Sequence, residues 1–431
     1  MRRLRRRVRH SLVAIPLVYL AAAIVLGDAA PALDRRYDPP FRLDVDTDTA
    51  RDILTATATG MIAFTGLVVS SVLVMVQFAA AQYSPRLVLW FRRDPIVKHA
   101  IGSFLATFLY SLVALRELQP ERDDTTPDVT VALALLLLGA ATILFLVLLE
   151  RVMDRLRPRT LYGAVAREGI TAAHAIYPHA LADSVGDDRR WSVAQPRVVA
   201  HRGRPGVIVS FDHEALLDVA LAGDATIELV PGVGEFVAPG QALLRIHGSV
   251  GAGDELLRRA LDVADERTIR QDPAFALRII VDTAIRALSP AVNDPTTAVH
   301  ALDVLEPFVR DLAGRDLEAS VARGPDGTAR LAWRSPSWPD LLELAFSEIR
   351  FYGASSVQIA RRLRAVLEDL RAATPPVRHP ALDAQLALLD ASVGAVHPAG
   401  SPEYAAARVA DRLGLGLTRP VADRAIVNRA D

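Results

Sequence analysis

Cysteine is absent from the 431-residue chain, and lysine occurs only once, at Lys98. Without cysteine the protein has no disulfide, no thiolate nucleophile and no thiolate metal site. A P-loop, a pyridoxal Schiff base and a protein-kinase ATP site each need a lysine in a soluble domain, and none is present. The 49 basic and 50 acidic residues leave a net charge of −1, so we expect no nucleic-acid partner.

Charged side chains are also missing from four long apolar stretches, residues 11–27, 53–85, 99–115 and 129–149. As helices rising 1.5 Å per residue, these would extend about 26, 50, 26 and 32 Å, compared with a hydrocarbon core of about 30 Å. They therefore predict four transmembrane helices. Because intramembrane ionisable groups usually mark proton relays and ion-pair gates, we expect neither here.

Arginine is concentrated on one side of this predicted bundle. Six of the first nine residues are arginine, and basic residues also follow the second and fourth stretches, whereas the two opposite loops are acidic on balance. The positive-inside rule then places both termini, and everything from residue 150 onward, in the cytoplasm. A cleaved signal peptide is the alternative for the first stretch, but Asp28 stands where cleavage requires a small residue.

Small and polar side chains recur at heptad spacing along the second stretch, which is otherwise rich in Val, Leu and Ile: Thr59, Ala63, Gly66, Ser70, Leu73, Gln77, Ala80 and Ser84. One interpretation is a seam for close helix packing. The other is that Thr59, Ser70, Gln77 and Ser84 line a polar path through a homo-oligomer, with Leu73 as a hydrophobic constriction. The spacing alone is compatible with both.

The predicted fold is a multi-pass α-helical membrane protein with an α+β cytoplasmic domain. We divide it into a basic N-terminus (1–10), the membrane domain (11–149), a helical connector (150–194), a β-rich domain (195–250), a helical domain with one hairpin (251–395) and a C-terminal helix with a loose tail (396–431). The β-rich domain has β-type runs at 196–200, 206–211, 226–230 and 242–246 and a helix after Asp212. Residues 234–244 resemble a turn of biotinyl and lipoyl barrels, which predicts a small barrel-like unit but no carrier function, because no lysine is present.

Residues 272–289 place Arg278, Asp282 and Arg286 on one face of a predicted helix. Two prolines follow, and Asp294 as N-cap with Pro295 in the first turn predicts a further helix over 295–313. Capping alone can explain Asp294. The alternative is that exposed N–H groups at this helix start bind an anion. The candidate ligand or interface residues are Arg267, Arg278, Arg286, Ser289, Asn293 and Asp294.

Four sequence segments carry a family resemblance: VQFAAAQYSPR at 76–86, ERT at 266–268, ALSPAVNDPTTA at 287–298 and EIRFYG at 348–353. Together they resemble the bacterial predicted membrane protein family, domain of unknown function 2254. The similarity extends to about residue 393 and implies four spans followed by a cytoplasmic domain, in the inner membrane of a bacterial cell. It implies no particular activity.

These observations favour a homo-oligomeric channel or transport protein in the lipid bilayer, gated by its cytoplasmic domain. The alternative is a membrane-tethered sensor or scaffold that binds a small anionic ligand or a protein partner. We expect no enzymatic activity, because no constellation of acid, base and nucleophile stands out. We likewise expect no cofactor and no metal site, since the ten histidines are scattered without metal-ligand spacing.

Overall fold

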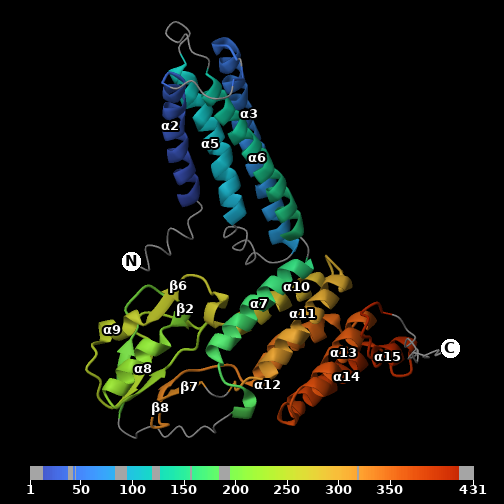
Figure 1. Cartoon of the computed structure of the whole chain (residues 1–431). Helices are drawn as coiled ribbons and strands as arrows, with labels where there is room; N and C mark the ends of the chain where they lie inside the picture. The colour runs from blue at the N-terminus through green and yellow to red at the C-terminus, as the bar shows by residue number, and fades with distance from the viewer. Residues whose placement is uncertain are drawn as a thin grey trace, which may run out of the picture. The chain divides into compact units, whose positions relative to one another are not determined.

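The computed structural model describes residues 13–36, 42–43, 45–82, 95–118, 127–155, 158–183, 195–317 and 320–416. The chain divides into two compact units, Met1–Arg157 and Pro158–Asp431 (Figure 1). Each unit is described below by itself.

The first unit contains four helices that are long and apolar enough to cross a membrane: α2 (Ala14–Asp34), α3 (Thr47–Gln82), α5 (Pro95–Glu117) and α6 (Asp128–Arg155). They confirm the four predicted spans. Each helix extends beyond its uncharged stretch, because the first and last turns accept charged residues that a hydropathy criterion leaves out. α3 is the longest, with 36 residues and a length of about 54 Å.

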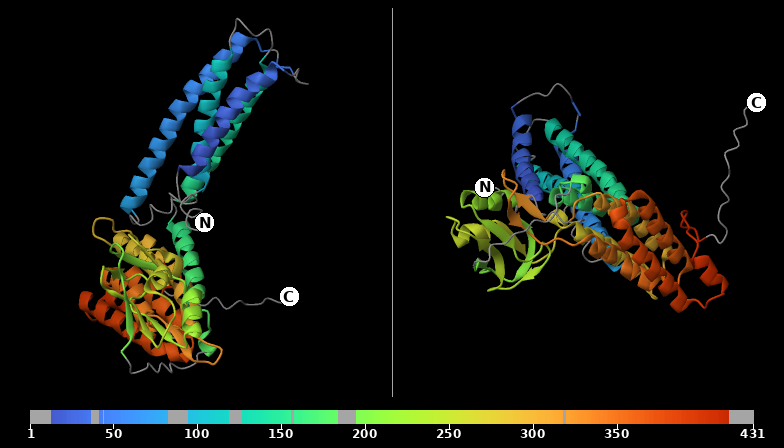
Figure 2. Two further views of the ribbon diagram at one scale, coloured as in Figure 1. Left: turned by 90° about the vertical axis from the view of Figure 1, so that its left-hand side faces the viewer. Right: turned by 90° about the horizontal axis from the view of Figure 1, so that it is seen from below.

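The centre of the first unit is α5, which packs against α2, α3 and α6 (Figures 1 and 2). Half of its apolar window is buried, compared with 22–28% in the other three helices. Phe104 on α5 contacts Phe64 on α3 edge to face, with ring centroids 5.4 Å apart, and Phe64 contacts Phe145 on α6 at 4.8 Å. Such aromatic pairs add about 0.5–1.5 kcal/mol each to the burial of their surface.

A carboxylate at the end of α2 caps the start of α6. Asp34 is buried and accepts hydrogen bonds from the backbone N–H groups of Val129 (2.8 Å) and Thr130 (3.0 Å) and from the Thr130 hydroxyl (2.6 Å). The Tyr110 hydroxyl donates to the Thr130 carbonyl at 2.8 Å. Negative charge at a helix N-terminus is favourable, so Asp34 joins two spans that are about 95 residues apart in sequence.

The second unit is built on helices that lie alongside one another: α7 (Pro158–Ile176), α10 (Pro273–Ala287), α11 (Pro295–Ala313), α12 (Trp338–Gly353), α13 (Val357–Ala373) and α14 (His379–Val396). The predicted caps are confirmed. Asp212 accepts the N–H of Ala215 at the start of α8 (His213–Ala222), and Asp294 accepts the N–H of Thr297 at the start of α11. The apolar faces of these helices meet in one buried core.

The strands of the second unit form two open sheets. Their bounds are β1 (Arg197–Ala200), β2 (Gly206–Phe211), β3 (Thr226–Leu229), β4 (Phe236–Val237), β5 (Ala242–His247), β6 (Leu261–Ala264), β7 (Val321–Arg323) and β8 (Ala329–Ala332). One sheet has the order β1-β5-β3-β8-β7 and the other has the order β4-β2-β6. The four β-type runs are therefore confirmed, and β7 and β8 pair as the one hairpin predicted within residues 251–395.

The barrel-like closure predicted for residues 195–250 is not formed by the described strands. β3 pairs with β5 on one side and, in parallel, with β8 on the other. The hairpin β7–β8, which is about 100 residues further along the chain, thus occupies the edge at which a barrel would have closed. Closure requires each strand to pair on both sides within one staggered ring, and here the sheet extends outward instead.

The C-terminal region is more ordered than predicted as far as residue 416. After α9 (Asp254–Arg259) and the helices above, the chain ends in α15 (Pro402–Ala407) and a turn around the buried Asp411. Its carboxylate accepts the N–H groups of Leu413 (3.0 Å), Gly414 (3.1 Å) and Gly416 (2.7 Å). Within the predicted C-terminal helix and loose tail (396–431), residues up to 416 thus have defined contacts, and the remainder of the tail lies outside the described residues.

Candidate functional site

The small and polar seam lies on a side of α3 that the other described helices do not cover. Thr59, Gly66, Ser70 and Gln77 are all exposed, and Leu73 between them is 56% exposed. At about 100° per residue, these positions fall within an arc of about 60°. Ser84, the fourth predicted pore-lining residue, lies outside the described residues.

The opposite side of α3 makes the contacts within the unit. Met61, Thr65 and Val68 are buried, and Met61 and Val68 belong to a cluster with Phe104 of α5 and Leu148 of α6. Thr65 donates its hydroxyl hydrogen bond back to the Met61 carbonyl at 2.6 Å, so its polarity is satisfied inside α3. The seam is thus not what holds α3 to the described part of the bundle.

Glycines in the first unit show the same division. A Cβ added to Gly27 on α2 would lie 2.7 Å from Val113 Cβ, and one added to Gly102 on α5 would lie 2.9 Å from the Tyr19 ring. A Cβ added to Gly60 or Gly66 on α3 would meet no atom within 4 Å. Small residues therefore provide close approach between α2 and α5, whereas on α3 they leave an open surface.

This exposed surface, Thr59, Gly66, Ser70, Leu73 and Gln77, is the candidate site, and we call it the α3 seam. Polar side chains within a membrane nearly always face protein or a water-filled cavity, because hydrocarbon leaves their hydrogen-bonding groups unsatisfied. An amide such as Gln77 facing lipid would be costly. The α3 seam has the chemistry of a surface that meets another protein chain or water.

Three of the predicted ligand residues meet in the turn between α10 and α11. The Ser289 hydroxyl donates to the Arg286 carbonyl at 2.7 Å, and Asn293 has a left-handed backbone with φ of 47°. Its N–H reaches the Ser289 carbonyl at 2.9 Å, which closes the turn. Asparagine tolerates this conformation better than most residues, so the turn explains its place.

Asp294 occupies the start of α11 with its own charge. Its carboxylate accepts the Thr297 N–H at 3.1 Å and the Thr297 hydroxyl at 2.6 Å. An anion bound at this helix start would meet a carboxylate and would find one of the free N–H groups already used. The geometry supports the capping interpretation of Asp294 over anion binding at this position.

The three candidate arginines lie in separate places. Arg267 pairs with Asp272 at 2.5 Å at the N-terminus of α10, whereas Arg286 is in the last turn, about 20 Å away along this 15-residue helix. Arg278 lies between them and bridges Asp282 on α10 (2.5 Å) to Glu348 on α12 (2.8 Å). The six candidates therefore do not form a single ligand site.

Asp272 has a structural role at the start of α10. It is buried, accepts the N–H of Phe275 at 2.9 Å and pairs with Arg267. Burial raises the pKa of the Asp272 carboxyl above its ordinary value, although Arg267 and the Phe275 N–H act in the opposite direction. Gly234 lies against the guanidinium of Arg267, where a Cβ would be 2.5 Å away, so protein covers one side of this arginine, whose side chain is 37% exposed.

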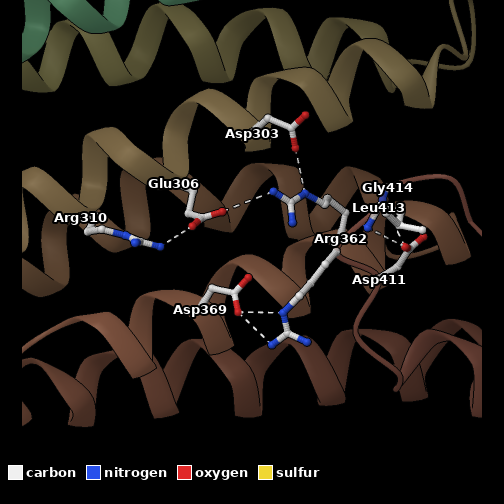
Figure 3. Close-up of polar contacts among 9 residues, drawn as sticks. Asp303, Glu306, Arg310, Arg362, Asp369, Asp411, Leu413 and Gly414 are labelled. Carbon is white, nitrogen blue, oxygen red and sulfur yellow. Dashed lines mark hydrogen bonds and ion pairs between the residues drawn. The ribbon is translucent and has the colours of Figure 1, made fainter. Parts of the chain in front are cut away.

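The sequence analysis missed a buried ionic network between α11 and α13. Arg362 donates from Nε to Asp303 Oδ1 at 2.9 Å and from Nη2 to Glu306 Oε2 at 3.3 Å, and Glu306 also accepts from Arg310 (Figure 3). The sequence does contain a sign of this network: Arg361 and Arg362 stand in a helix that has a continuous apolar face. Arginines that are buried in such a helix need acidic partners. In the described part of the chain, no group of three His, Asp or Glu side chains could hold a metal ion.

Four apolar helices joined to an α+β region define a multi-pass membrane protein with a large portion outside the spans. The chain belongs to the family described as "Predicted membrane protein (DUF2254)", whose sequence model matches residues 9–369. It is 31% identical over 364 residues to the uncharacterized protein Rv1290c of Mycobacterium tuberculosis (strain H37Rv), and equally to the uncharacterized protein Mb1321c of Mycobacterium bovis. Each alignment covers 79% of this chain and 67% of the relative. No solved structure matches the chain.

Proposed function

We propose that the protein is a homo-oligomeric channel or transport protein in which the α3 seam lines the path and the second unit gates it. The observation that carries the proposal is the exposure of Thr59, Ser70 and Gln77 on a membrane-spanning helix whose opposite face is already packed. Copies of α3 around a common axis would remove these groups from lipid and present them to water. The proposal involves no covalent chemistry and no cofactor.

The order of side chains along the α3 seam suggests how such a path would work. Gly66 leaves room for close approach between neighbouring helices. Ser70 and Gln77 provide hydroxyl and amide groups that can replace water around a passing solute. Leu73 lies between them and forms a hydrophobic constriction, which gates by excluding water.

The test is solute flux through liposomes that contain the full-length protein. Gln77→Leu should reduce flux by about tenfold or more while leaving the fold intact, because it removes a polar lining group that packs on nothing described in the unit. Thr142→Val is the matched control, since Thr142 is an exposed polar residue on α6 whose hydroxyl bonds to the Leu138 carbonyl at 2.9 Å. Absence of flux under every voltage, pH and osmotic step would count against the proposal.

A second candidate function, a membrane-tethered sensor or scaffold for a small anionic ligand or a protein partner, has one supporting observation. Trp333 Nε1 is buried and has no hydrogen-bond partner among the described residues, and its ring lies 5.5 Å from that of Phe211. An unsatisfied buried donor is unusual, and this N–H would donate a hydrogen bond to a ligand oxygen. Thermal-shift measurements on the full-length protein with nucleotides and small organic anions test this: stabilisation in a protein that is silent in flux assays would favour it.

A further inference from the structure

Several chain segments of the second unit converge at one end of its helices. The turn between α10 and α11 lies there, and α12 reaches the same end because it runs in the direction of α10. Arg278 contacts Glu348 midway along the two helices (2.8 Å), and a Cβ on Gly353 would be 3.4 Å from the Leu288 side chain at the end of α10. The last turn of α12 therefore lies beside the turn between α10 and α11.

The C-terminal turn reaches this end as well. Gln358, in the first turn of α13, donates to the Gly414 carbonyl at 2.6 Å. A Cβ on Gly414 would be only 2.7 Å from Val299 in the second turn of α11. The segment 413–416 is thus fixed against the second turn of α11 and the first turn of α13.

The same end also holds the start of α7. This helix runs alongside α11 in the same direction: Gly169 faces Phe308, His174 pairs with Asp311 at 3.0 Å, and Arg315 reaches the carbonyl of Tyr177. The beginning of α7 therefore points toward the beginning of α11. The membrane-spanning α6 ends at Arg155, and α7 starts three residues later at Pro158. Three residues of extended chain cover at most about 11 Å.

This end of the helices carries exposed apolar side chains, and we call it the apolar end: Phe351 (74% exposed), Leu415 (68%), Leu413 (59%), Val292 (50%) and Tyr352 (49%). They come from three separate segments, the α10–α11 turn, the last turn of α12 and the C-terminal turn. Clusters of large exposed apolar groups mark surfaces that meet protein or membrane.

We propose that the apolar end rests in the interfacial layer of the lipid leaflet at which α6 ends. Only two residues separate α6 from α7 in the sequence, so lipid is an apolar phase within reach of this end without assembly with another molecule. Phe351 and Leu415 enter the region between headgroups and acyl chains, and Tyr352 keeps its hydroxyl among the headgroups, as amphipathic aromatic residues do at membrane surfaces. The second unit is then held against the membrane by a surface as well as by its tether.

The absence of cysteine allows a direct test on the full-length protein. The single variants are Phe351→Cys, Leu415→Cys and Val377→Cys, and each introduced cysteine is labelled with an environment-sensitive fluorophore. The fluorophore emission is then measured in phosphatidylcholine–phosphatidylglycerol vesicles, with or without nitroxide-labelled lipid. Val377 is the matched control: it is 69% exposed, and the neighbouring Arg378 contacts the carbonyls of Ala313 and Arg315, at the far end of α11. We expect nitroxide lipid to quench most of the emission at positions 351 and 415 and little at 377.

Equal quenching at 351 and 377 would overturn the proposal. A second outcome would also overturn it: a fluorophore at 351 that nitroxide lipid does not quench, together with spin–spin broadening when a nitroxide is attached at 351 instead. That result would assign the apolar end to contact between copies of the chain. Val292→Cys is the second variant if Phe351→Cys does not fold, since Val292 lies in the turn and is half exposed. The measurement does not depend on flux, so its result is separate from that of the proposed transport function.

Discussion

Arg362 offers the sharpest test of what holds α11 to α13. It is buried, and its guanidinium serves the carboxylates of both Asp303 and Glu306 (Figure 3). Arg362→Met keeps an unbranched apolar stem of similar length in the same place but removes the charge and all donors. Asp303 and Glu306 then remain near the helix interface with less positive charge to balance them.

Removing one partner of a buried ion pair costs about 3–5 kcal/mol, because the remaining charge has lost its compensation. Asp303 retains some contact with water, with 34% of its side chain exposed, so we expect the lower end of that range, about 3 kcal/mol. The triple variant Arg362→Met, Asp303→Asn, Glu306→Gln should regain about 1–2 kcal/mol, since the amides no longer carry unpaired charge.

Arg371→Met is the matched control within the same helix. Arg371 pairs with Asp383 at 2.6 Å, but both side chains are about half exposed, so this pair should contribute only about 0.2–1 kcal/mol. The measurement is denaturant unfolding of the detergent-solubilised protein, monitored by tryptophan fluorescence. Trp338, the first residue of α12, is a suitable probe because it is buried and donates to the Arg378 carbonyl. Equal losses for the two variants would refute the assignment of stability to the buried network.

Three further variants test other parts of the fold. Burial raises the pKa of Tyr177 to about 12, so the native state keeps a proton that the unfolded chain releases near pH 10. The free energy of unfolding therefore falls as the pH rises between these two values. In alkaline unfolding curves, Tyr177→Phe should remove about 2–3 kcal/mol of this loss of stability. Gly169→Ala should cost about 1–3 kcal/mol in thermal unfolding, because its Cβ would lie 2.5 Å from the Phe308 ring, whereas Gly251→Ala, which meets nothing within 4 Å, should cost under 1 kcal/mol. Asp34→Asn should lower thermal stability in detergent by about 1–3 kcal/mol through the α6 cap, and Asp28→Asn, in an exposed pair with Arg116, should have little effect.

Local chemistry predicts the boundaries of elements well in this chain. α11 begins and ends where the sequence indicates, because Asp294 and Pro295 start it and Gly314 follows it. α2 was underestimated, since its uncharged stretch stops at Gly27 whereas the helix continues to Asp34. The reason for the extension is tertiary: Asp34 is needed to cap α6, and that contact is invisible in the local pattern.

Pairing between distant segments could not be predicted. The parallel contact of β3 with β8 joins Ile227 to Leu331, and nothing in either run specifies the other as its neighbour. A barrel and an open sheet place the same alternating residues on their strands, so periodicity does not distinguish them. The separation of the candidate arginines could not be predicted for a related reason: Arg267 and Arg286 are close in sequence, but α10 separates them by its own length.

The α3 seam shows how far spacing alone can be used. Heptad spacing located Thr59, Ser70 and Gln77 on one face, but only the packed positions of Met61 and Val68 show that this face is turned away from the other described helices. The two exposed surfaces of the protein call for different partners. An amide and hydroxyls within the bilayer require protein or water, whereas Phe351 and Leu415, at the apolar end of the second unit, are compatible with lipid. Nitroxide lipid should therefore quench labels on Phe351 but not labels on Ser70, and the reverse pattern would contradict both proposals at once.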